Sequence, residues 1–282
     1  MKFTKIKSNA KINLSLNVTG KSFLKLHKVE SLVCFVDLHD LIFLRRINAL
    51  SHHIYFYGKF SKDINKENTI SKLLEILDKK NLLKDQKFEV KIKKNIPHRS
   101  GMGGGSMNAA SLLMYFVKKN FINIKKKNLI DITKLIGSDV VLGLNTKNTI
   151  LSSSGKVTNY KNKIKYHLLI VKPNFGCSTK LIYSRVRSFS KSKYNNPRYL
   201  LFNQKNLKNS VNDLEKIAFK KYPKLNTIRL FLLKSSNIIF VRMTGSGSSI
   251  VAYFQSKKAS HIAQKEFKKK FNNYWCITSK TI

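Results

Sequence analysis

The sequence feature that most constrains this fold is a cluster of glycines within Pro97-His98-Arg99-Ser100-Gly101-Met102-Gly103-Gly104-Gly105-Ser106. Alternating apolar residues predict a strand over 87–93 before it, and a broad apolar face predicts a helix over 107–121 after it. Glycines let backbone N–H groups approach a phosphate, and the following helix adds its positive end. Four near-contiguous glycines cost conformational entropy, so we favour a phosphate-binding loop over a merely structural turn.

The common nucleotide-binding motifs do not describe this loop. The pattern G-x-x-x-x-G-K-[ST] nearly matches at Gly20-Lys21-Ser22, but Ser15 stands at its first position. In a dinucleotide-binding or protein-kinase loop, a glycine would stand where this chain has Ser106. We expect Ser106 at the helix N-cap, where its hydroxyl can cap the helix or reach a phosphate-bound cation.

Periodicity along the 282 residues predicts an α+β protein with two lobes that meet near residues 152–163. A second glycine turn is expected at 244–249, and the Ser-, Lys- and Asn-rich stretch 184–203 is expected to be a mobile surface segment. Expected strands cover 3–18, 31–35, 40–46, 87–93, 164–171, 238–243 and 250–254. Expected helices cover 68–79, 107–121, 129–136, 207–220, 225–233 and 256–271.

The charge of the chain is strongly positive, because 55 Lys and Arg residues against 14 Asp and Glu residues give a formal net charge of +41. Such a charge is typical of nucleic-acid binders. Here, however, Lys, Asn and Ile recur throughout the chain, the lysines are dispersed, and no RNA-binding signature is present. We therefore favour a compositional bias and expect no specific nucleic-acid partner.

Cysteine spacing and hydropathy exclude further classes. Cys34, Cys177 and Cys276 are far apart with no C-x-x-C pair, which indicates free thiols in a reducing compartment and neither a disulfide framework nor a zinc site. No apolar run of about 18 residues predicts a membrane-spanning helix, and the basic N-terminus lacks the apolar core of a signal peptide. We expect a cytoplasmic protein without a membrane partner; its oligomeric state is not predicted.

Several motifs follow one another in a fixed order along the chain. They are Ser8-Asn9-Ala10-Lys11-Ile12-Asn13-Leu14, the glycine loop with Asn108-Ala109-Ala110 behind it, and Met243-Thr244-Gly245-Ser246-Gly247-Ser248-Ser249. Together they resemble the N-terminal strand, phosphate loop and C-terminal turn of the galactokinase, homoserine kinase, mevalonate kinase and phosphomevalonate kinase (GHMP) superfamily. Gly137-Ser138-Asp139-Val140 and Asn212-Asp213-Leu214-Glu215 further resemble motifs of the 4-diphosphocytidyl-2-C-methyl-D-erythritol kinase family.

The resemblance covers essentially the whole chain and implies a fold and a reaction. The implied fold is α+β and two-lobed, with an N-terminal lobe of the ribosomal-protein-S5-domain-2-like type and a C-terminal α/β sandwich lobe. The implied domains are an ATP-binding kinase domain over 1–158 and a C-terminal GHMP kinase domain over 159–282. The implied reaction is ATP- and Mg²⁺-dependent phosphorylation of the 2-hydroxyl of 4-diphosphocytidyl-2-C-methyl-D-erythritol, a small cytidine diphosphate sugar-alcohol, in non-mevalonate isoprenoid synthesis.

The resemblance also implies roles for individual residues. Asp139 would take or orient the hydroxyl proton, and Lys11 would stabilise the developing negative charge. Residue type alone would make Asp139 a helix cap or solvated turn, and Lys11 one of many lysines. The ATP site would comprise Asn68, Pro97, Gly101, Met102, Gly103, Gly104, Gly105 and Ser106, with Ser106 also the candidate ligand of Mg²⁺.

For the substrate, the resemblance implies that His27 hydrogen-bonds the cytosine edge and that Tyr183 stacks on the ring. Thr179 would line the same pocket, and Asn13 would lie near the erythritol. By residue type alone, His27 is an ordinary surface histidine and Tyr183 a half-buried core aromatic. The chain also departs from the family pattern, because Leu26 replaces the usual tyrosine of the cytosine platform.

Two loop motifs differ from the family as well. Val141 stands where a proline is usual, and Ser153-Ser154-Gly155-Lys156 replaces a G-x-G-x-[EK] stretch. These differences affect the shapes of the two loops.

Two alternative functions stay open at this point. The first is another small-molecule GHMP kinase of the homoserine or mevalonate type, against which His27 and the 212–215 motif argue. The second is a basic nucleic-acid-binding protein on a related fold. Such a protein would have no reason to keep Lys11, Asp139 and the glycine loop together.

Overall fold

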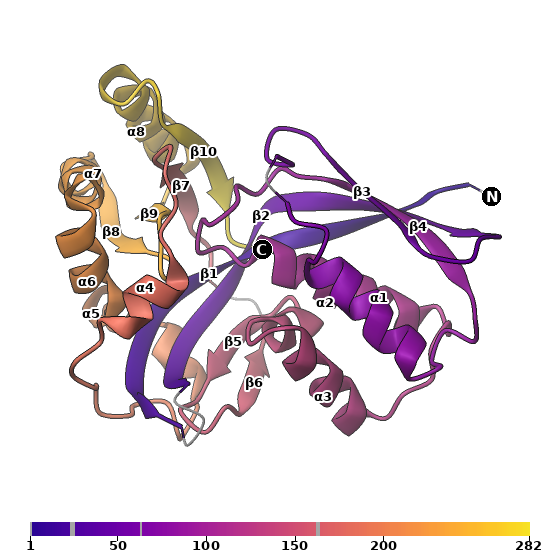
Figure 1. Cartoon of the computed structure of the whole chain (residues 1–282). Coiled ribbons are helices and arrows are strands. Elements are labelled where there is room, and N and C mark those ends of the chain that lie inside the picture. Colours follow the sequence, from indigo (N-terminus) through magenta and orange to yellow (C-terminus); the bar gives the residue numbers. More distant parts are fainter. Residues whose placement is uncertain (1, 23–25, 63, 162–163) are drawn as a thin grey trace. The chain divides into compact units, whose positions relative to one another are not determined.

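The computed structural model describes residues 2–22, 26–62, 64–161 and 164–282, and it is an α+β protein with two sheets (Figure 1). Its contacts define two compact units, each assembled from stretches that are distant in sequence. Unit 1 comprises Met1–Ala10, Leu38–His98 and Gly103–Thr146; unit 2 comprises Lys11–Asp37, Arg99–Met102 and Lys147–Ile282. The predicted domain division at residue 158 concerns the order of domains along the chain and stays a prediction.

The first sheet has the strand order β3-β4-β2-β5-β6, with β1 paired to β2. Strand β2 is antiparallel to β4 at one end and to β5 at the other, and β3 runs parallel to β4. The strands are β1 (Thr4–Lys21), β2 (His27–Ile47), β3 (His53–Tyr57), β4 (Lys87–Lys93), β5 (Asn148–Leu151) and β6 (Val157–Tyr160).

Strand β2 corrects the prediction of two separate strands over 31–35 and 40–46. It is one continuous strand of 21 residues. The stretch between the two predicted strands contains neither Gly nor Pro, so no residue there interrupts the ladder. The same strand therefore supplies residues to both units.

The helices of unit 1 pack together on one face of the sheet. They are α1 (Thr69–Lys79), α2 (Gly104–Lys118), α3 (Lys126–Ile136) and the 3₁₀ helix η1 (Val140–Leu144). Their apolar stripes meet buried residues of β2 and β4 in one core, which includes Leu73, Phe88, Val90 and Phe116. Apolar residues at helical spacing predicted α1 because that spacing places them on one buried face. The end of α3 was also predicted, but the helix begins three residues before the predicted 129.

Helix α2 begins three residues earlier than the predicted 107, because Gly103, at φ +67°, is its N-cap. The expectation that Ser106 caps the helix is therefore wrong. Ser106 lies inside the first turn, and the N-cap glycine carries no side chain that could accept a hydrogen bond from the helix.

Unit 2 contains a four-stranded antiparallel sheet in the order β10-β7-β9-β8. Helices α7 and α8 pack against this sheet through a core that includes Leu169, Ala252, Leu232 and Phe267. The strands are β7 (His167–Lys172), β8 (Ile238–Met243), β9 (Ile250–Phe254) and β10 (Trp275–Lys280). The helices are α4 (Thr179–Ser184), η2 (Tyr199–Phe202), α5 (Gln204–Asn209), α6 (Leu214–Lys221), α7 (Pro223–Leu233) and α8 (Lys257–Lys270).

The helix predicted over 207–220 is broken into α5 and α6. Between them, the Asn212 amide donates hydrogen bonds to the carbonyls of Met243 and Gly245, at 2.9 and 2.8 Å. The Asp213 carboxylate accepts a hydrogen bond from the backbone N–H of Val18 at 2.7 Å. Polar side chains that bond distant backbone in this way compete with the helix, so periodicity alone could not show the break.

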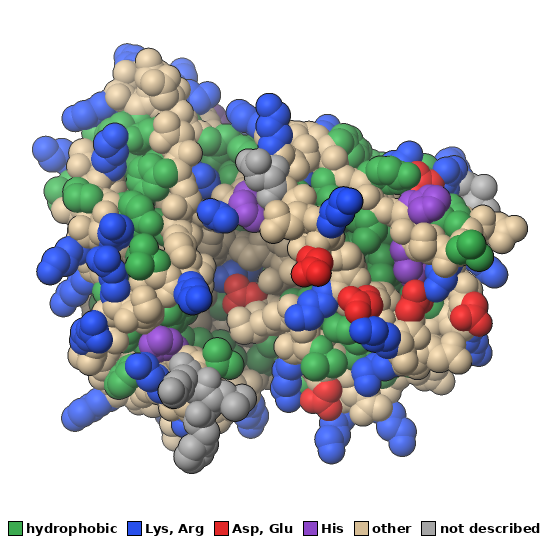
Figure 2. Space-filling view, in the orientation of Figure 1, with side chains coloured by type: hydrophobic (Ala, Val, Ile, Leu, Met, Phe, Trp, Pro, Cys, Tyr) green, Lys and Arg blue, Asp and Glu red, His purple; other side chains and the backbone are tan. Residues whose placement is uncertain are grey.

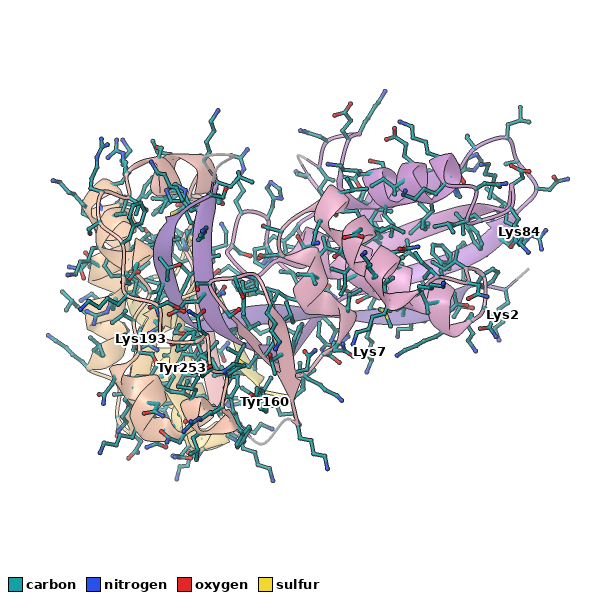
Figure 3. The ribbon with its side chains drawn as sticks, turned by 90° about the horizontal axis from the view of Figure 1, so that it is seen from below. Lys2, Lys7, Lys84, Tyr160, Lys193 and Tyr253 are labelled. Carbon is teal, nitrogen blue, oxygen red and sulfur yellow. The ribbon has the colours of Figure 1, made fainter. Side chains whose placement is uncertain are left out.

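Part of the segment 184–203 is packed, contrary to the expectation of a mobile surface stretch. Tyr194 is buried, and the fully buried Glu30 accepts hydrogen bonds from Ser192 Oγ and from the backbone N–H groups of Lys193 and Tyr194. Figure 3 labels Lys193 of this segment and also Tyr253, which is the largest fully buried side chain among the described residues.

Basic side chains are scattered over the visible surface of each unit and form no single patch there (Figure 2). Lys2, Lys7 and Lys84 illustrate this in unit 1, where all three are exposed (Figure 3). The dispersion agrees with a compositional origin of the charge. Among the described residues, no helix has the length and apolar character needed to cross a membrane.

Gly143 of η1 provides a test of the packing in unit 1. A Cβ there would lie 2.6 Å from Ala110 Cβ of α2, whereas a Cβ at Gly137 would meet only Val140 Cγ2 at 3.8 Å. We expect Gly143→Ala to lower the free energy of unfolding by roughly 1–3 kcal/mol through overpacking. The control Gly137→Ala should change it by less than about 1 kcal/mol. Urea unfolding of both variants checks this, and equal midpoints would contradict the close helix contact.

Candidate active site

The glycine loop ends in unit 1 at the start of helix α2. No side chain caps this helix within the described residues 64–161, so the N–H groups of its first turn keep no side-chain acceptor. A Cβ on Gly104 would lie 3.1 Å from Ile96 Cγ2, and one on Gly105 would lie 3.1 Å from Thr69 Oγ1. The loop therefore needs glycine at positions 104 and 105 for close packing. The N–H groups in the first turn of α2 are donors suited to an anion such as a phosphate.

Asn68 of the predicted ATP site is the N-cap of α1. Its side-chain oxygen accepts hydrogen bonds from the N–H groups of Ile70 and Ser71, at 2.9 and 3.2 Å. Its amide donates to the Asn65 and Lys66 carbonyls. The side chain thus has a structural task, and its place beside adenine stays a prediction.

Thr69, the next residue, connects α1 to the glycine loop. Its hydroxyl donates a hydrogen bond of 2.8 Å to the Gly105 carbonyl. Pro97, at the other end of the loop, is buried. Asn68, Pro97 and Gly103 to Ser106 thus all lie in unit 1.

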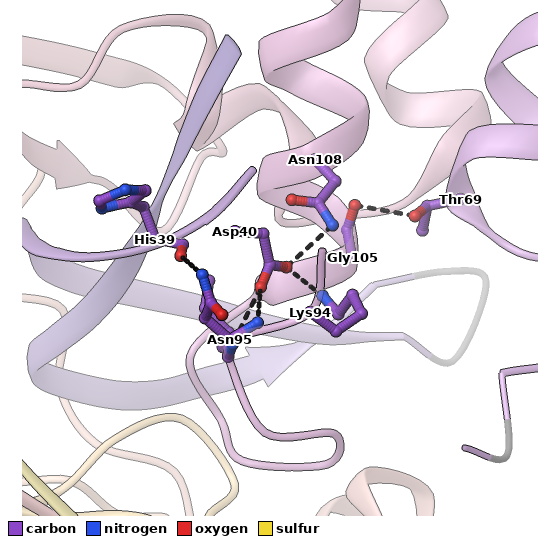
Figure 4. A network of polar contacts seen from close by, with 8 residues as sticks. His39, Asp40, Thr69, Lys94, Asn95, Gly105 and Asn108 are labelled. Carbon is purple, nitrogen blue, oxygen red and sulfur yellow. Dashed lines mark hydrogen bonds and ion pairs between the residues drawn. The ribbon is translucent and has the colours of Figure 1, made fainter. Parts of the chain in front are cut away.

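A buried polar network surrounds Asp40 near this loop (Figure 4). The carboxylate pairs with Lys94 Nζ and accepts hydrogen bonds from the N–H groups of Asn95 and Ile96, at 2.7 and 2.8 Å. It also accepts one from Asn108 Nδ2 of α2 at 3.0 Å. Asp40 is not among the site residues predicted from the sequence. Its signal was available, because Asp40 interrupts the alternating apolar residues Leu38, Ile42 and Leu44 with a charge on the buried face of the strand.

Asp139 of unit 1 lies in the short turn between α3 and η1. Its backbone is helical, at φ −84° and ψ −12°, and its carbonyl accepts a hydrogen bond from the Leu142 N–H at 3.2 Å. The residue is half-buried, and its carboxylate does not cap η1. The turn thus fixes the backbone of Asp139 without using its carboxylate as a cap.

In unit 2, the first part of the glycine loop touches the second glycine turn. Gly101 has φ +74°, and a Cβ there would overlap the Thr244 carbonyl oxygen. The N–H groups of Ser248 and Ser249 donate to the carbonyls of Arg99 and Ser100, at 3.3 and 3.2 Å. Two glycine turns that the sequence separates by more than 130 residues are therefore joined backbone to backbone.

Lys11 and Asn13 are held by the same assembly in unit 2. The buried Lys11 donates its backbone N–H to the Met102 carbonyl at 3.2 Å and its Nζ to Asn13 Oδ1 at 2.7 Å. The Asn13 backbone N–H in turn donates a hydrogen bond to Thr244 Oγ1 at 3.0 Å. The structure thus brings four predicted site residues of unit 2 together: Lys11, Asn13, Gly101 and Met102.

His27 and Tyr183 form the second group of predicted residues in unit 2. Their ring centroids lie 5.1 Å apart with an interplanar angle of 43°. Burial, and to a lesser degree the charge of Lys21, lowers the pKa of His27 and favours the neutral imidazole. His27 Nε2 is buried, and it has no hydrogen-bond partner in the described part of the chain. An unpaired ring nitrogen of this kind can bind a polar ligand edge.

Leu26 and Thr179 are the other two residues of unit 2 that the sequence connected with the cytosine pocket. Leu26 is 67% exposed, so its side chain contributes little packing within the protein. Thr179, at the start of α4, shares a hydrogen bond of 2.8 Å with Ser246 of the second glycine turn. Thr179 is thereby connected to the turn that also contacts Gly101, although the sequence showed no sign of this bond.

The acidic, histidine and cysteine side chains of the described residues were compared with the grouping that a metal ion needs. Nowhere in the described ranges do three or more His, Cys, Asp or Glu side chains gather as they would to hold a metal ion.

Comparison with known proteins now places the chain. It matches the family model for the GHMP kinases N terminal domain over residues 68–155 and that for the GHMP kinases C terminal domain over 195–273. It is 59% identical, over 99% of both chains, to a 4-diphosphocytidyl-2-C-methyl-D-erythritol kinase of Pelagibacter ubique. The chain belongs to the 4-diphosphocytidyl-2-C-methyl-D-erythritol kinase family of the GHMP kinases.

More distant relatives agree with this family. A 4-diphosphocytidyl-2-C-methyl-D-erythritol kinase of Clostridioides difficile is 30% identical over 99% of this chain and 96% of its own. The crystal structure of a 4-(cytidine 5'-diphospho)-2C-methyl-D-erythritol kinase superposes with a TM-score of 0.79 at 20% identity, covering 98% of this chain and 99% of that one. The predicted α+β GHMP-kinase fold is confirmed, and membership in a kinase family implies the use of ATP.

The contact between the two glycine turns of this GHMP kinase can be tested at Gly101. Gly101→Ala should lower the free energy of unfolding by about 3 kcal/mol or more, because backbone strain at positive φ adds to overlap with the Thr244 carbonyl. Gly58 is a matched control with φ +95°, where a Cβ would lie 3.2 Å from the Lys94 carbonyl oxygen. Gly58→Ala should cost about 1–2 kcal/mol. Chemical denaturation measures both, and equal losses would argue against the backbone contact.

Proposed function

We propose that the chain transfers the γ-phosphoryl group of ATP to the 2-hydroxyl of 4-diphosphocytidyl-2-C-methyl-D-erythritol. The observation that supports this most strongly is the 59% identity across 99% of both chains to the kinase of that name. The likeness to a homoserine kinase of Cytophaga hutchinsonii, at 16% identity and a TM-score of 0.74, concerns the fold alone. The homoserine- or mevalonate-type alternative therefore has weaker support.

The glycine loop is proposed to hold the phosphates of ATP. Positive φ values at Gly101 and Gly103, and the uncapped first turn of α2, give the loop the donors and the close backbone approach that phosphates need. Met102, Gly104, Gly105 and Pro97 complete this site in the proposal, with Asn68 toward adenine. Ser106, in the first turn of α2, is the proposed hydroxyl ligand for a Mg²⁺ ion carried on the phosphates.

Asp139 and Lys11 are proposed to carry the transfer. The substrate oxygen forms a bond to the γ-phosphorus, the bond from that phosphorus to the β–γ bridging oxygen breaks, and ADP leaves. Asp139 takes the proton of the hydroxyl as this happens. The ammonium of Lys11, which Asn13 holds at 2.7 Å, stabilises the negative charge on the transferred group.

Recognition of the substrate is proposed to fall to unit 2. The neutral His27, with Nε2 unpaired among the described residues, would hydrogen-bond the cytosine edge, and Tyr183 beside it would stack on the ring. Thr179 would line the same pocket, and Asn13 would lie near the erythritol. Specific nucleic-acid binding is not part of this function, and a cytoplasmic location stays a prediction.

The role of Asp139 leads to a prediction about turnover. Asp139→Asn should reduce kcat by about 10²–10⁴-fold, because an amide cannot take the proton, while ATP affinity stays within about threefold of wild type. Asp131→Asn is a matched control, since Asp131 is an exposed acid on α3 whose carboxylate pairs with Lys134 of the same helix. Steady-state kinetics and ATP titration check both variants. More than about a tenth of wild-type turnover in Asp139→Asn would refute the general-base assignment.

The role of His27 leads to a prediction about substrate affinity. His27→Ala should raise KM for the cytidylated substrate about tenfold or more, because a buried hydrogen bond of roughly 1–3 kcal/mol is lost, while KM for ATP barely changes. Leu26→Tyr should leave the substrate KM equal or lower it, since a ring adds stacking surface. His261→Ala, at a half-buried position of α8, is the control. An unchanged substrate KM in His27→Ala would remove cytosine recognition from this residue.

A further inference from the structure

Asp40 of unit 1 is a buried carboxylate with several polar partners, and the proposed chemistry does not use it. Its side chain is fully buried in strand β2, and Lys94, its ion-pair partner, is only 6% exposed. A buried ion pair is a weak means of stabilisation, since its desolvation offsets much of the attraction between the charges. A contribution to stability therefore does not by itself explain why a charged pair is buried here.

The partners of Asp40 lie on both sides of the glycine loop. Oδ1 accepts hydrogen bonds from the N–H groups of Asn95 and Ile96, which stand immediately before Pro97. Oδ2 accepts from Asn108 in the second turn of α2, after the loop, and pairs with Lys94 Nζ (Figure 4). One carboxylate thus fixes the segment that enters the loop and the helix that leaves it.

The neighbours of this carboxylate reach the loop glycines themselves. A Cβ on Gly104 would lie 3.1 Å from Ile96 Cγ2 and 3.4 Å from Lys94 Nζ. The Ile96 and Lys94 side chains therefore pack against Gly104, the first residue of α2. Any shift of the 94–96 segment is transmitted to Gly104, because there is no spare space between them.

We propose that Asp40 is a positioning residue for the phosphate loop: by binding both ends of the loop, it sets the direction of the N–H groups at the start of α2 for the phosphates of ATP. This inference rests on the proposed function only in that the loop binds ATP. Asn108 acts with it, because its amide carries the link from Asp40 to the helix.

Asp40→Asn is the direct test. In this variant the amide oxygen can still accept the hydrogen bonds from the Asn95 and Ile96 N–H groups. The amide NH₂ group would then face Lys94 and Asn108, which are also donors, so those two interactions would be lost. We expect Kd for Mg-ATP, measured by calorimetry on the full chain, to rise about tenfold. KM for ATP should rise in parallel, while KM for the cytidylated alcohol stays within about twofold.

Glu89→Gln is the matched control. Glu89 is a buried carboxylate in β4 of the same unit, and it pairs with Arg45 and Lys91 instead of with the loop. Removing the Glu89 charge should lower the free energy of unfolding and leave the Mg-ATP Kd within about twofold of wild type. A merely structural role for Asp40 would give the same Kd in both variants and would overturn the proposal.

The double variant Asp40→Asn/Asn108→Asp supplies a rescue test. It exchanges donor and acceptor across the 3.0 Å contact, so that an amide at 40 can donate to a carboxylate at 108. We expect it to recover part of the lost ATP affinity, and a Kd no better than that of Asp40→Asn would count against the link to the helix.

Asn108→Ala decides the matter if Asp40→Asn does not fold. It keeps the ion pair and both backbone bonds of Asp40 but removes the link to α2, so the Mg-ATP Kd should rise several-fold. An unchanged Kd overturns the proposal. If wild type binds Mg-ATP but does not phosphorylate the cytidylated alcohol, the proposed substrate fails and this inference stands. If wild type does not bind Mg-ATP, both fail.

Discussion

The backbone contact between Gly101 and Thr244 is the constraint on which much of unit 2 depends. A side chain at position 101 would occupy the space of the Thr244 carbonyl, so the two glycine turns can meet in this way only with glycine at position 101. The Thr244 hydroxyl then bonds the Gly101 carbonyl and accepts the Asn13 N–H. Through Asn13, the contact determines the position of the Lys11 ammonium.

Much of the fold could be predicted from the sequence, wherever a segment follows one period and contacts one core. Strands β4, β8 and β9 begin and end where alternation predicted, and α1 was expected to within one residue. One failure involves long-range hydrogen bonds. The break between α5 and α6 depends on Asn212 binding carbonyls about 30 residues away, and no local pattern records such partners.

The site divides in the same way. Resemblance of motifs selected Lys11, Asn13, Gly101 and Met102, and the structure joins them through bonds that the sequence could not show. Asp40 was missed although a charge on the buried face of a strand was visible. The chain has only 14 acidic residues against 55 basic ones, so few carboxylates are available for buried positions. Glu30 and Asp40 both use theirs to hold backbone N–H groups.

Strand β2 and the glycine loop both supply residues to each unit, and six stretches of chain alternate between the two. No single cut in the polypeptide can therefore release either unit whole. A truncated gene would yield a fragment with exposed core from both units, and recombination within the coding sequence could not exchange one unit for that of a relative. A single exchange point in the gene therefore always carries parts of both units.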